Sequence, residues 1–199
     1  QQAISAKLRG VLVEETAGRK SKAMVVLPTG AGKTRVATQT ILQAFIDGEL
    51  RGPVLWIAQS QELCEQAVQT FNQVWRGLCT DQRIDSPLAI GRLWGTNEVH
   101  EPDTALSIVV ATDAKVEAIL GKHDHSDYEW LSTPDAVFID EGHVAGDSPR
   151  YTRILTWLGV DGRNWERPLV GLSATPFKGT SEAATKALAA RFGNNPLQA

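Results

Sequence analysis

The amino-acid sequence predicts an α/β fold in which a mostly parallel sheet carries helices on both faces. Short apolar runs alternate with helical patterns along the chain, the order expected when crossover helices join parallel strands. Several polar residues directly follow predicted strands. Because ligands bind at the carboxyl ends of parallel strands, these residues are expected along one rim of the sheet. They are Lys33, Ser60, Thr112, Asp140 and Ser173.

The first half of the chain is assigned from apolar periodicity and from glycine and proline breaks. Ile4, Leu8, Val11 and Leu12 recur at helical spacing, which predicts an N-terminal helix with one buried face. Ser60 is a suitable N-cap for a later helix. The predicted elements are a helix at 3–12, a loop around Gly18, a strand leading into Leu27, a helix from 35 that ends at Asp47–Gly48, a strand at 53–58, a helix after Ser60 and a loop at 80–86.

The second half repeats the alternation of strands and helices. Apolar runs predict strands at 88–94, 106–111, 136–140 and 169–173. Helices are predicted at 113–120, 151–158 and 181–192, and polar loops at 95–103 and 122–128. The tail at 193–199 is predicted to be mobile.

Length and composition indicate one ordinary globular domain covering 1–199, with 42% hydrophobic and 22% charged residues. The net charge of −3 argues against a large phosphate-binding surface, although Arg19, Lys20 and Lys22 form a local basic cluster. Cys64 and Cys79 form no metal or redox motif, so a reducing, cytoplasmic setting is expected. No apolar run approaches the roughly 20 residues of a membrane span, so no membrane partner is expected.

The segment 25–34 has the order strand, glycine turn and helix, which is typical of a phosphate-binding loop. Gly30 and Gly32 permit backbone conformations that a Cβ forbids, so that amide groups can turn toward a phosphate. Lys33 would reach the outer phosphates and the Thr34 hydroxyl would hold Mg²⁺. Leu27 occupies the place where the strict pattern has glycine, and the alternative is a buried strand followed by an ordinary turn.

Asp140 and Glu141 form the second candidate site, at the end of the apolar run 136–139. A phosphate-loop enzyme needs a carboxylate at such a strand end to hold Mg²⁺, the role predicted for Asp140. Glu141 is placed to orient or deprotonate an attacking water. The alternative is a solvated acidic turn, which the phosphate loop makes less favourable because both halves of a nucleotide site are then present.

Several motifs together resemble superfamily 2 helicases and translocases. Segment 28–34 resembles their first motif, Asp140–His143 the second motif of the DExH branch, and 171–176 the Ser-Ala-Thr motif. Segments 58–66 and 109–112 resemble the two motifs that grip a nucleic-acid strand. The resemblance runs from about residue 24 to 177 and is greatest to the type III restriction enzyme res-subunit group of DNA translocases.

The resemblance implies a RecA-like P-loop fold and a role for each matching residue. Catalytic roles fall to Lys33, Asp140 and Glu141, and the Mg²⁺ ligands would be Thr34 and Asp140. His143, Ser173 and Thr175 would couple the nucleotide state to nucleic-acid contact, and Ser60, Gln61 and Thr112 would touch strand phosphates. The ATP-binding residues would be Pro28, Thr29, Gly30, Ala31, Gly32, Lys33, Thr34 and Arg35.

The expected function is that of the N-terminal RecA-like motor lobe of an ATP-dependent helicase or translocase, with DNA favoured over RNA. A second RecA-like lobe is expected outside this chain, and without its arginine fingers the isolated lobe would be nearly inactive as an ATPase. A fused or associated nuclease or methylase is a further expected partner. Two alternatives stay open, a non-motor P-loop enzyme such as a kinase and a non-catalytic nucleic-acid-binding module.

The sequence departs from the family pattern at two places. Gln59 and Gln61 replace the usual proline and arginine of the first strand-binding motif, which predicts weaker phosphate affinity there. The position of the family's adenine-reading glutamine falls just before residue 1, so Gln1 and Gln2 are not assigned to it.

Other residues are interpreted as structural. His123–Asp124–His125 is read as a solvated loop rather than a metal site. Trp56 and Trp94 are expected in the core, and packing at helix ends or loops is favoured over base stacking for Trp75, Trp130, Trp157 and Trp165. For Arg150 and Arg153, phosphate contact and a solvated helix face stay equally open.

Overall fold

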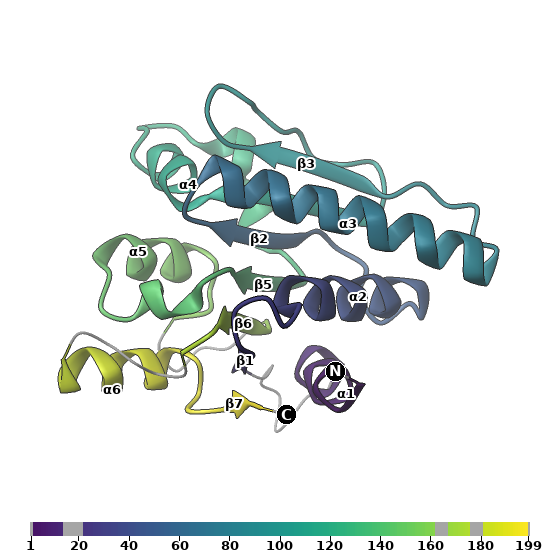
Figure 1. Cartoon of the computed structure of the whole chain (residues 1–199). Coiled ribbons are helices and arrows are strands. Elements are labelled where there is room, and N and C mark those ends of the chain that lie inside the picture. Colours follow the sequence, from purple (N-terminus) through teal and green to yellow (C-terminus); the bar gives the residue numbers. More distant parts are fainter. Residues whose placement is uncertain (1, 14–21, 162–166, 176–180, 199) are drawn as a thin grey trace.

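A computed structural model of the chain describes residues 2–13, 22–161, 167–175 and 181–198, and these form one seven-stranded sheet. The strand order is β3-β4-β2-β5-β6-β1-β7, and every neighbouring pair is parallel (Figure 1). The strands are β1 (Lys22–Val26), β2 (Val54–Ala58), β3 (Ala89–Leu93), β4 (Ser107–Thr112), β5 (Ala136–Ile139), β6 (Leu169–Ser173) and β7 (Pro196–Leu197).

Helices cover the sheet on both faces, which confirms the predicted α/β architecture. Helices α1, α2 and α3 pack on one face and α4, α5 and α6 on the other. Trp56 of β2 points into the first core, where its ring stacks on Phe138, and its neighbour Ile57 points into the second core. The helices are α1 (Gln2–Val13), α2 (Lys33–Ile46), α3 (Gln61–Gln82), α4 (Asp113–Leu120), α5 (Pro149–Trp157) and α6 (Glu182–Arg191), with 3₁₀ turns η1 (Ser126–Ser132) and η2 (Gly142–Ala145).

Three predicted loops or tails were wrong in part. Helix α3 continues into the segment 80–86 that was predicted as a loop and ends at Gln82, because Arg83 adopts a left-handed conformation that terminates it. The polar loop at 122–128 leads into η1, and Tyr128 is buried. The tail is not free, because Pro196 and Leu197 pair with β1 as an edge strand.

Several sequence predictions fall on residues outside the described ranges. These are the loop at Gly18, the basic residues Arg19 and Lys20, Trp165, and residues 176–177 at the end of the region of family resemblance. Within the described ranges, no helix is both long and apolar enough to cross a membrane.

Parallel pairing brings the carboxyl ends of β1, β2, β4, β5 and β6 to one rim of the sheet. In the register, Ala58 lies beside Thr112, Ile57 beside Ile139, and Val26 beside Ser173. The residues that follow these strands are the predicted site residues, so the fold places them along the rim as expected.

Candidate nucleotide-binding site

The phosphate loop joins β1 to α2 and depends on two glycines with positive φ. Gly30 has φ of 78° and Gly32 has φ of 82°, values that favour glycine over any residue with a Cβ. Gly32 is the N-cap of α2 and has no side chain, so the amides at the start of the helix find no side-chain acceptor there. An uncapped helix N-terminus with these amides is suited to bind an anion.

The buried carboxyl group of Asp140 lies at the end of β5. The amide of Asp140 donates to the carbonyl of Ile57 at 2.8 Å, which fixes the residue against β2. Burial raises the pKa of Asp140 to about 6, while the amide of Glu141, which donates to Oδ1 at 3.0 Å, and the charge of Lys33 both favour the ionised form. A carboxylate that has lost this much hydration is a group that a bound cation would stabilise.

Glu141 adopts a left-handed backbone conformation, with φ of 49° and ψ of 49°. This conformation is uncommon for residues other than glycine, and it turns the chain from β5 into η2. Oε1 of Glu141 lies 3.8 Å from Nζ of Lys33, and a third of the glutamate side chain is exposed. The exposed part leaves the carboxylate accessible to water.

One cavity of about 420 Å³ unites the phosphate loop with the acidic pair. This volume is in the range of small-ligand sites. Lys33, Asp140 and Glu141, which are far apart in the sequence, therefore surround a single cavity. The predicted residues that line it are Thr29, Gly30, Gly32, Lys33, Thr34, Arg35, Asp140 and Glu141.

Sequence reasoning missed the wall of this cavity that α3 provides. Gln66, Thr70 and Gln73 line the cavity from α3, which packs beside α2 (Figure 1). Their spacing places them on one face of the helix. The spacing of these residues could have indicated a shared polar face of α3. Only the packing of α3 against α2 shows that this face lines the cavity.

A chain of polar contacts leads from Glu141 to β6. Nδ1 of His143 lies 3.3 Å from Oε2 of Glu141 and 3.3 Å from Oγ of Ser173. The Ser173 hydroxyl donates to the carbonyl of Thr175 at 3.0 Å and accepts from the Thr175 amide at 3.1 Å. The three residues predicted to couple nucleotide to nucleic acid are thus linked in series, with Glu141 next to His143, His143 next to Ser173, and Ser173 bonded to Thr175.

This contact requires η2 to lie very close to β6. A Cβ added at Gly142 would come within 2.8 Å of Cα of Gly171 and 3.2 Å of Sδ of Met24. The φ of Gly142 is not among the positive values, so no unusual backbone conformation requires glycine here. Gly142 is needed because the absence of a Cβ lets the backbone of η2 approach that of Gly171.

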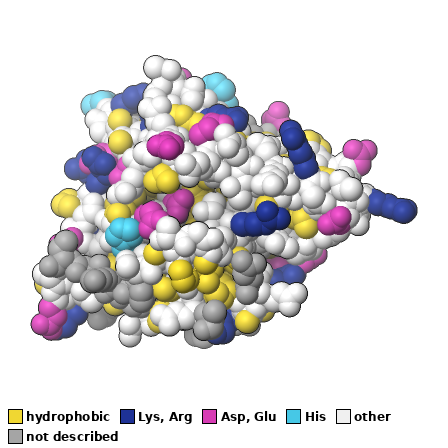
Figure 2. Space-filling view, viewed as in Figure 1, with side chains coloured by type: hydrophobic (Ala, Val, Ile, Leu, Met, Phe, Trp, Pro, Cys, Tyr) yellow, Lys and Arg dark blue, Asp and Glu magenta, His cyan; other side chains and the backbone are white. Residues whose placement is uncertain are grey.

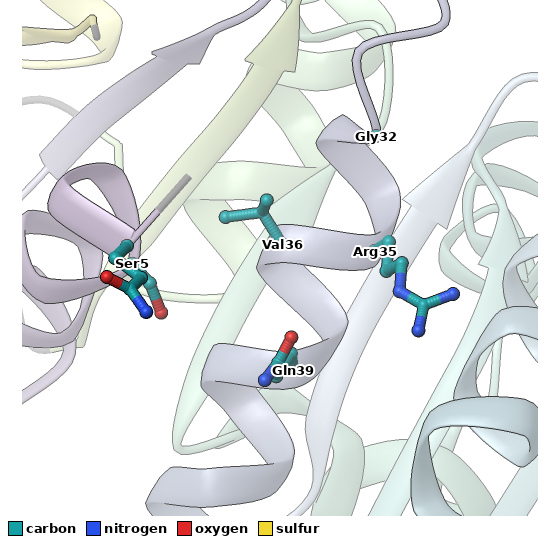
Figure 3. A pocket seen from close by; sticks show the side chains of 6 residues that line it. Ser5, Gly32, Arg35, Val36 and Gln39 are labelled. Atoms are coloured by element: carbon teal, nitrogen blue, oxygen red, sulfur yellow. The ribbon is translucent and has the colours of Figure 1, made fainter. Parts of the chain in front are cut away.

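A second cavity of about 290 Å³ adjoins the phosphate loop between α1 and α2 (Figure 3). Gly32 and Arg35 border both cavities, which makes the two spaces neighbours. Ser5 of α1 holds the far wall, because its hydroxyl lies 2.7 Å from that of Thr40. Gln2, Val36 and Gln39 complete the lining.

The residues predicted to touch a nucleic-acid strand lie at two helix starts on the rim. Ser60 is the predicted N-cap of α3, its hydroxyl accepts the Leu63 amide at 3.2 Å, and both Ser60 and Gln61 are exposed. Thr112 is buried, at 6% exposed, and its hydroxyl caps α4 by accepting the Lys115 amide at 3.3 Å. The Thr112 hydroxyl is therefore used as a helix cap, and the contacts of Ser60, Gln61 and Thr112 with a nucleic-acid strand stay predictions.

Several structural interpretations are confirmed. Trp56, Trp94 and Trp75 are buried, and Cys64 is a buried free thiol. His123 and Asp124 are exposed, as expected for a solvated loop. Among the described residues, no group of three or more His, Cys, Asp and Glu side chains is arranged to hold a metal ion.

Comparisons with known proteins agree with the geometry. The family model described as "Type III restriction enzyme, res subunit" matches residues 1–178. A comparison with curated proteins gave no match.

Three similar solved structures share the fold. The Hef helicase domain of Pyrococcus furiosus has a TM-score of 0.65 and 22% identity, covering 96% of this chain and 36% of that chain. Dbp5 of S. cerevisiae, bound to RNA and ADP BeF3, has a TM-score of 0.65 and 15% identity, covering 98% and 45%. The Type ISP restriction-modification enzyme LlaGI, solved with a DNA substrate mimic, has a TM-score of 0.56 and 15% identity, covering 88% and 17%.

The chain spans less than half the length of each of these three proteins, and identities this low show the fold alone. The family model, in contrast, covers most of the sequence. The solved structures confirm the predicted RecA-like fold, and the family model shows that the chain belongs to the family of the type III restriction enzyme res subunit.

Proposed function

We propose that this chain is the ATP-binding motor lobe of an ATP-dependent helicase or translocase that acts on nucleic acid. The observation that carries the proposal is the single cavity shared by Lys33, Thr34, Asp140 and Glu141. A phosphate loop and a carboxylate pair around one space are the two halves of a site for a nucleoside triphosphate and its cation. The fold family supports the same activity.

Each residue has a role that its surroundings support. The loop amides and the ammonium of Lys33 would bind the phosphates, and Lys33 is only 9% exposed, which strengthens its charge interactions. Glu141 would accept a proton from the attacking water, because its carboxylate is partly exposed and lies next to Lys33. The adjoining cavity beside Arg35 would take the base of the nucleotide.

Mg²⁺ fits the residues present. Mg²⁺ in phosphate-transfer sites is held by one or two carboxylates together with substrate phosphates, so the absence of a larger acidic cluster among the described residues agrees with it. Thr34 and the buried Asp140 would hold the ion. When bound, it would neutralise charge that develops on the phosphate oxygens.

The proposal extends to DNA as the substrate and to a two-lobed motor. DNA is supported by the family, whose description is a restriction enzyme subunit, although the same fold occurs in Dbp5 bound to RNA. On the face drawn in Figure 2, Lys and Arg side chains stand apart from one another, as the net charge of −3 leads one to expect. A second lobe would therefore supply much of the strand grip, and a nuclease or methylase, fused or associated, would complete the system.

Binding of a fluorescent ATP analogue with and without Mg²⁺ tests the proposal directly. We expect binding by the 199-residue chain that requires Lys33 and Asp140, with almost no ATP hydrolysis, because an arginine finger from another lobe contributes about 10³–10⁵ in rate. Absence of binding at millimolar ATP–Mg²⁺ would favour a non-catalytic module. Rapid hydrolysis stimulated by DNA in the isolated chain would contradict the two-lobed mechanism, and phosphate transfer to a small acceptor would indicate a kinase.

A further inference from the structure

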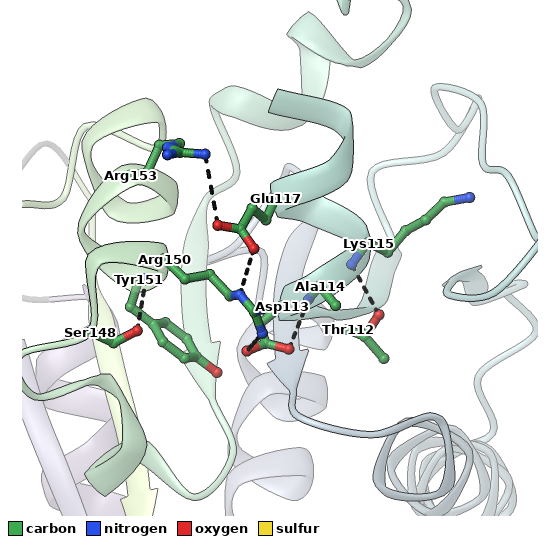
Figure 4. A network of polar contacts seen from close by, with 9 residues as sticks. All are labelled: Thr112, Asp113, Ala114, Lys115, Glu117, Ser148, Arg150, Tyr151 and Arg153. Carbon is green, nitrogen blue, oxygen red and sulfur yellow. Dashed lines mark hydrogen bonds and ion pairs between the residues drawn. The ribbon is translucent and has the colours of Figure 1, made fainter. Parts of the chain in front are cut away.

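Arg150 joins two helices that the sequence leaves unconnected. From the first turn of α5, its Nη1 donates to Oδ2 of Asp113 at 3.0 Å and its Nε donates to Oε2 of Glu117 at 2.7 Å (Figure 4). Asp113 and Glu117 lie one turn apart on the same face of α4. The guanidinium therefore holds α4 at two points one turn apart, an ion-pair role that was not considered from the sequence.

The contact with Asp113 sits at the start of α4. Oδ1 of Asp113 accepts the Ala114 amide at 2.7 Å, while Oδ2 receives Arg150. The Asp113 side chain is only 7% exposed, and a carboxylate this buried is strongly disfavoured without a cationic partner. The position of the first turn of α4 is thereby tied to the position of Arg150.

Arg150 is also close to the candidate nucleotide site along the chain. Asp140 and Glu141 lead directly into η2, and Ser148 caps α5 by accepting the Tyr151 amide at 3.4 Å. Burial raises the pKa of the Tyr151 phenol, and the charges of Asp113 and Asp140 raise it further. The first turn of α5 thus lies within electrostatic reach of both the cavity and α4.

We propose that Arg150 is a positioning residue that transmits the nucleotide state of the cavity to the first turn of α4. The inference rests on the proposed nucleotide binding. Ligand binding at Asp140 and Glu141 displaces η2 and the start of α5. The hydrogen bonds of Arg150 to Asp113 and Glu117 then move α4 together with α5. This route is separate from the contacts of His143 with Ser173, because it leads to β4 on the opposite side of β5 and β2.

Amide hydrogen exchange in the full 199-residue chain tests the route. ATP–Mg²⁺ is expected to change exchange at 114–117 by about fivefold, the lower end of typical coupling between sites. In Arg150→Gln the change disappears although the fluorescent ATP analogue still binds. Arg150→Lys, a point charge that cannot bridge both carboxylates, keeps the pairing with Asp113 and loses most of the change. Circular dichroism reports whether each variant is folded.

Arg153→Gln is the matched control. Arg153 lies in the same helix and reaches Glu117 only at 3.7 Å, with 61% of its side chain exposed, so the response should persist. A full response in Arg150→Gln or Arg150→Lys would overturn the inference, and so would a wild-type chain that binds ATP–Mg²⁺ with no change at 114–117. Failure of the wild type to bind ATP–Mg²⁺ would instead overturn the proposed function on which the inference rests.

Discussion

Replacing Asp140 with asparagine is expected to stabilise the protein at neutral pH. The carboxyl group is 7% exposed, and burial raises its pKa from the ordinary value of 3.8 to about 6. The ionised form is therefore less favourable in the folded protein than in the unfolded chain. Asparagine keeps the shape and the oxygen that accepts the Glu141 amide, and it has no charge to bury.

The size and the pH range of the effect follow from the two pKa values. Because the folded pKa is raised, the stability contribution is fully present below about pH 4 and is lost as the pH rises through about 6. The loss corresponds to about 3 kcal/mol above pH 7. The asparagine variant does not titrate at this position, so its advantage should be absent at pH 4 and largest at pH 8.

Urea unfolding at several pH values, in the presence of EDTA, measures this difference. Asp85→Asn provides a control, since this exposed loop carboxylate should change stability by no more than about 0.5 kcal/mol at any pH. An Asp140→Asn variant that is no more stable at pH 8, or whose advantage is the same at pH 4, would refute the argument that burial sets the properties of this carboxyl group.

Three further predictions concern binding and packing. Lys33→Ala should weaken binding of the ATP analogue by at least about tenfold, since it removes a charged hydrogen-bond donor, and fluorescence titration at constant Mg²⁺ would show it. Gly142→Ala should destabilise the chain by about 1–3 kcal/mol in urea unfolding, because its Cβ meets the Gly171 backbone, whereas Gly77→Ala, in open space on α3, should stabilise it. Tyr151→Phe should raise the unfolding free energy by about 1 kcal/mol, since the buried hydroxyl has no hydrogen-bond partner among the described residues; a decrease would contradict this.

The sequence was sufficient for the parallel sheet and for the location of the rim. Each strand that matters is a continuous buried apolar run, and a polar residue follows directly where the strand ends. Such transitions are local, so they can be recognised without tertiary information. The same reasoning predicted that Lys33 and Asp140 lie together, because parallel strands align their carboxyl ends.

Features that depend on distant packing could not be predicted. The edge strand β7 contains only Pro196 and Leu197, too few residues for any periodicity, and it forms because β1 offers an unpaired edge. Thr112 was expected to contact a phosphate, and its burial became apparent only from the packing around the start of α4. Arg150 illustrates the same limit, since its partners come from a helix more than thirty residues earlier in the chain.

The backbone conformation of Glu141 and the burial of the Asp140 carboxyl group are both energetically unfavourable, and both bear on the proposed function. Three non-glycine residues in the described ranges have positive φ, and Arg83 and Asn194 both follow the ends of helices, where this conformation commonly terminates a helix. Glu141 instead precedes a 3₁₀ turn, and it stands next to the buried Asp140. Unfavourable backbone and unfavourable desolvation thus fall on adjacent residues at the wall of one cavity, the place where strain is retained for function. An asparagine at 140 and a glycine at 141 would relieve both, so the presence of the two carboxylates here supports a ligand that compensates these unfavourable terms.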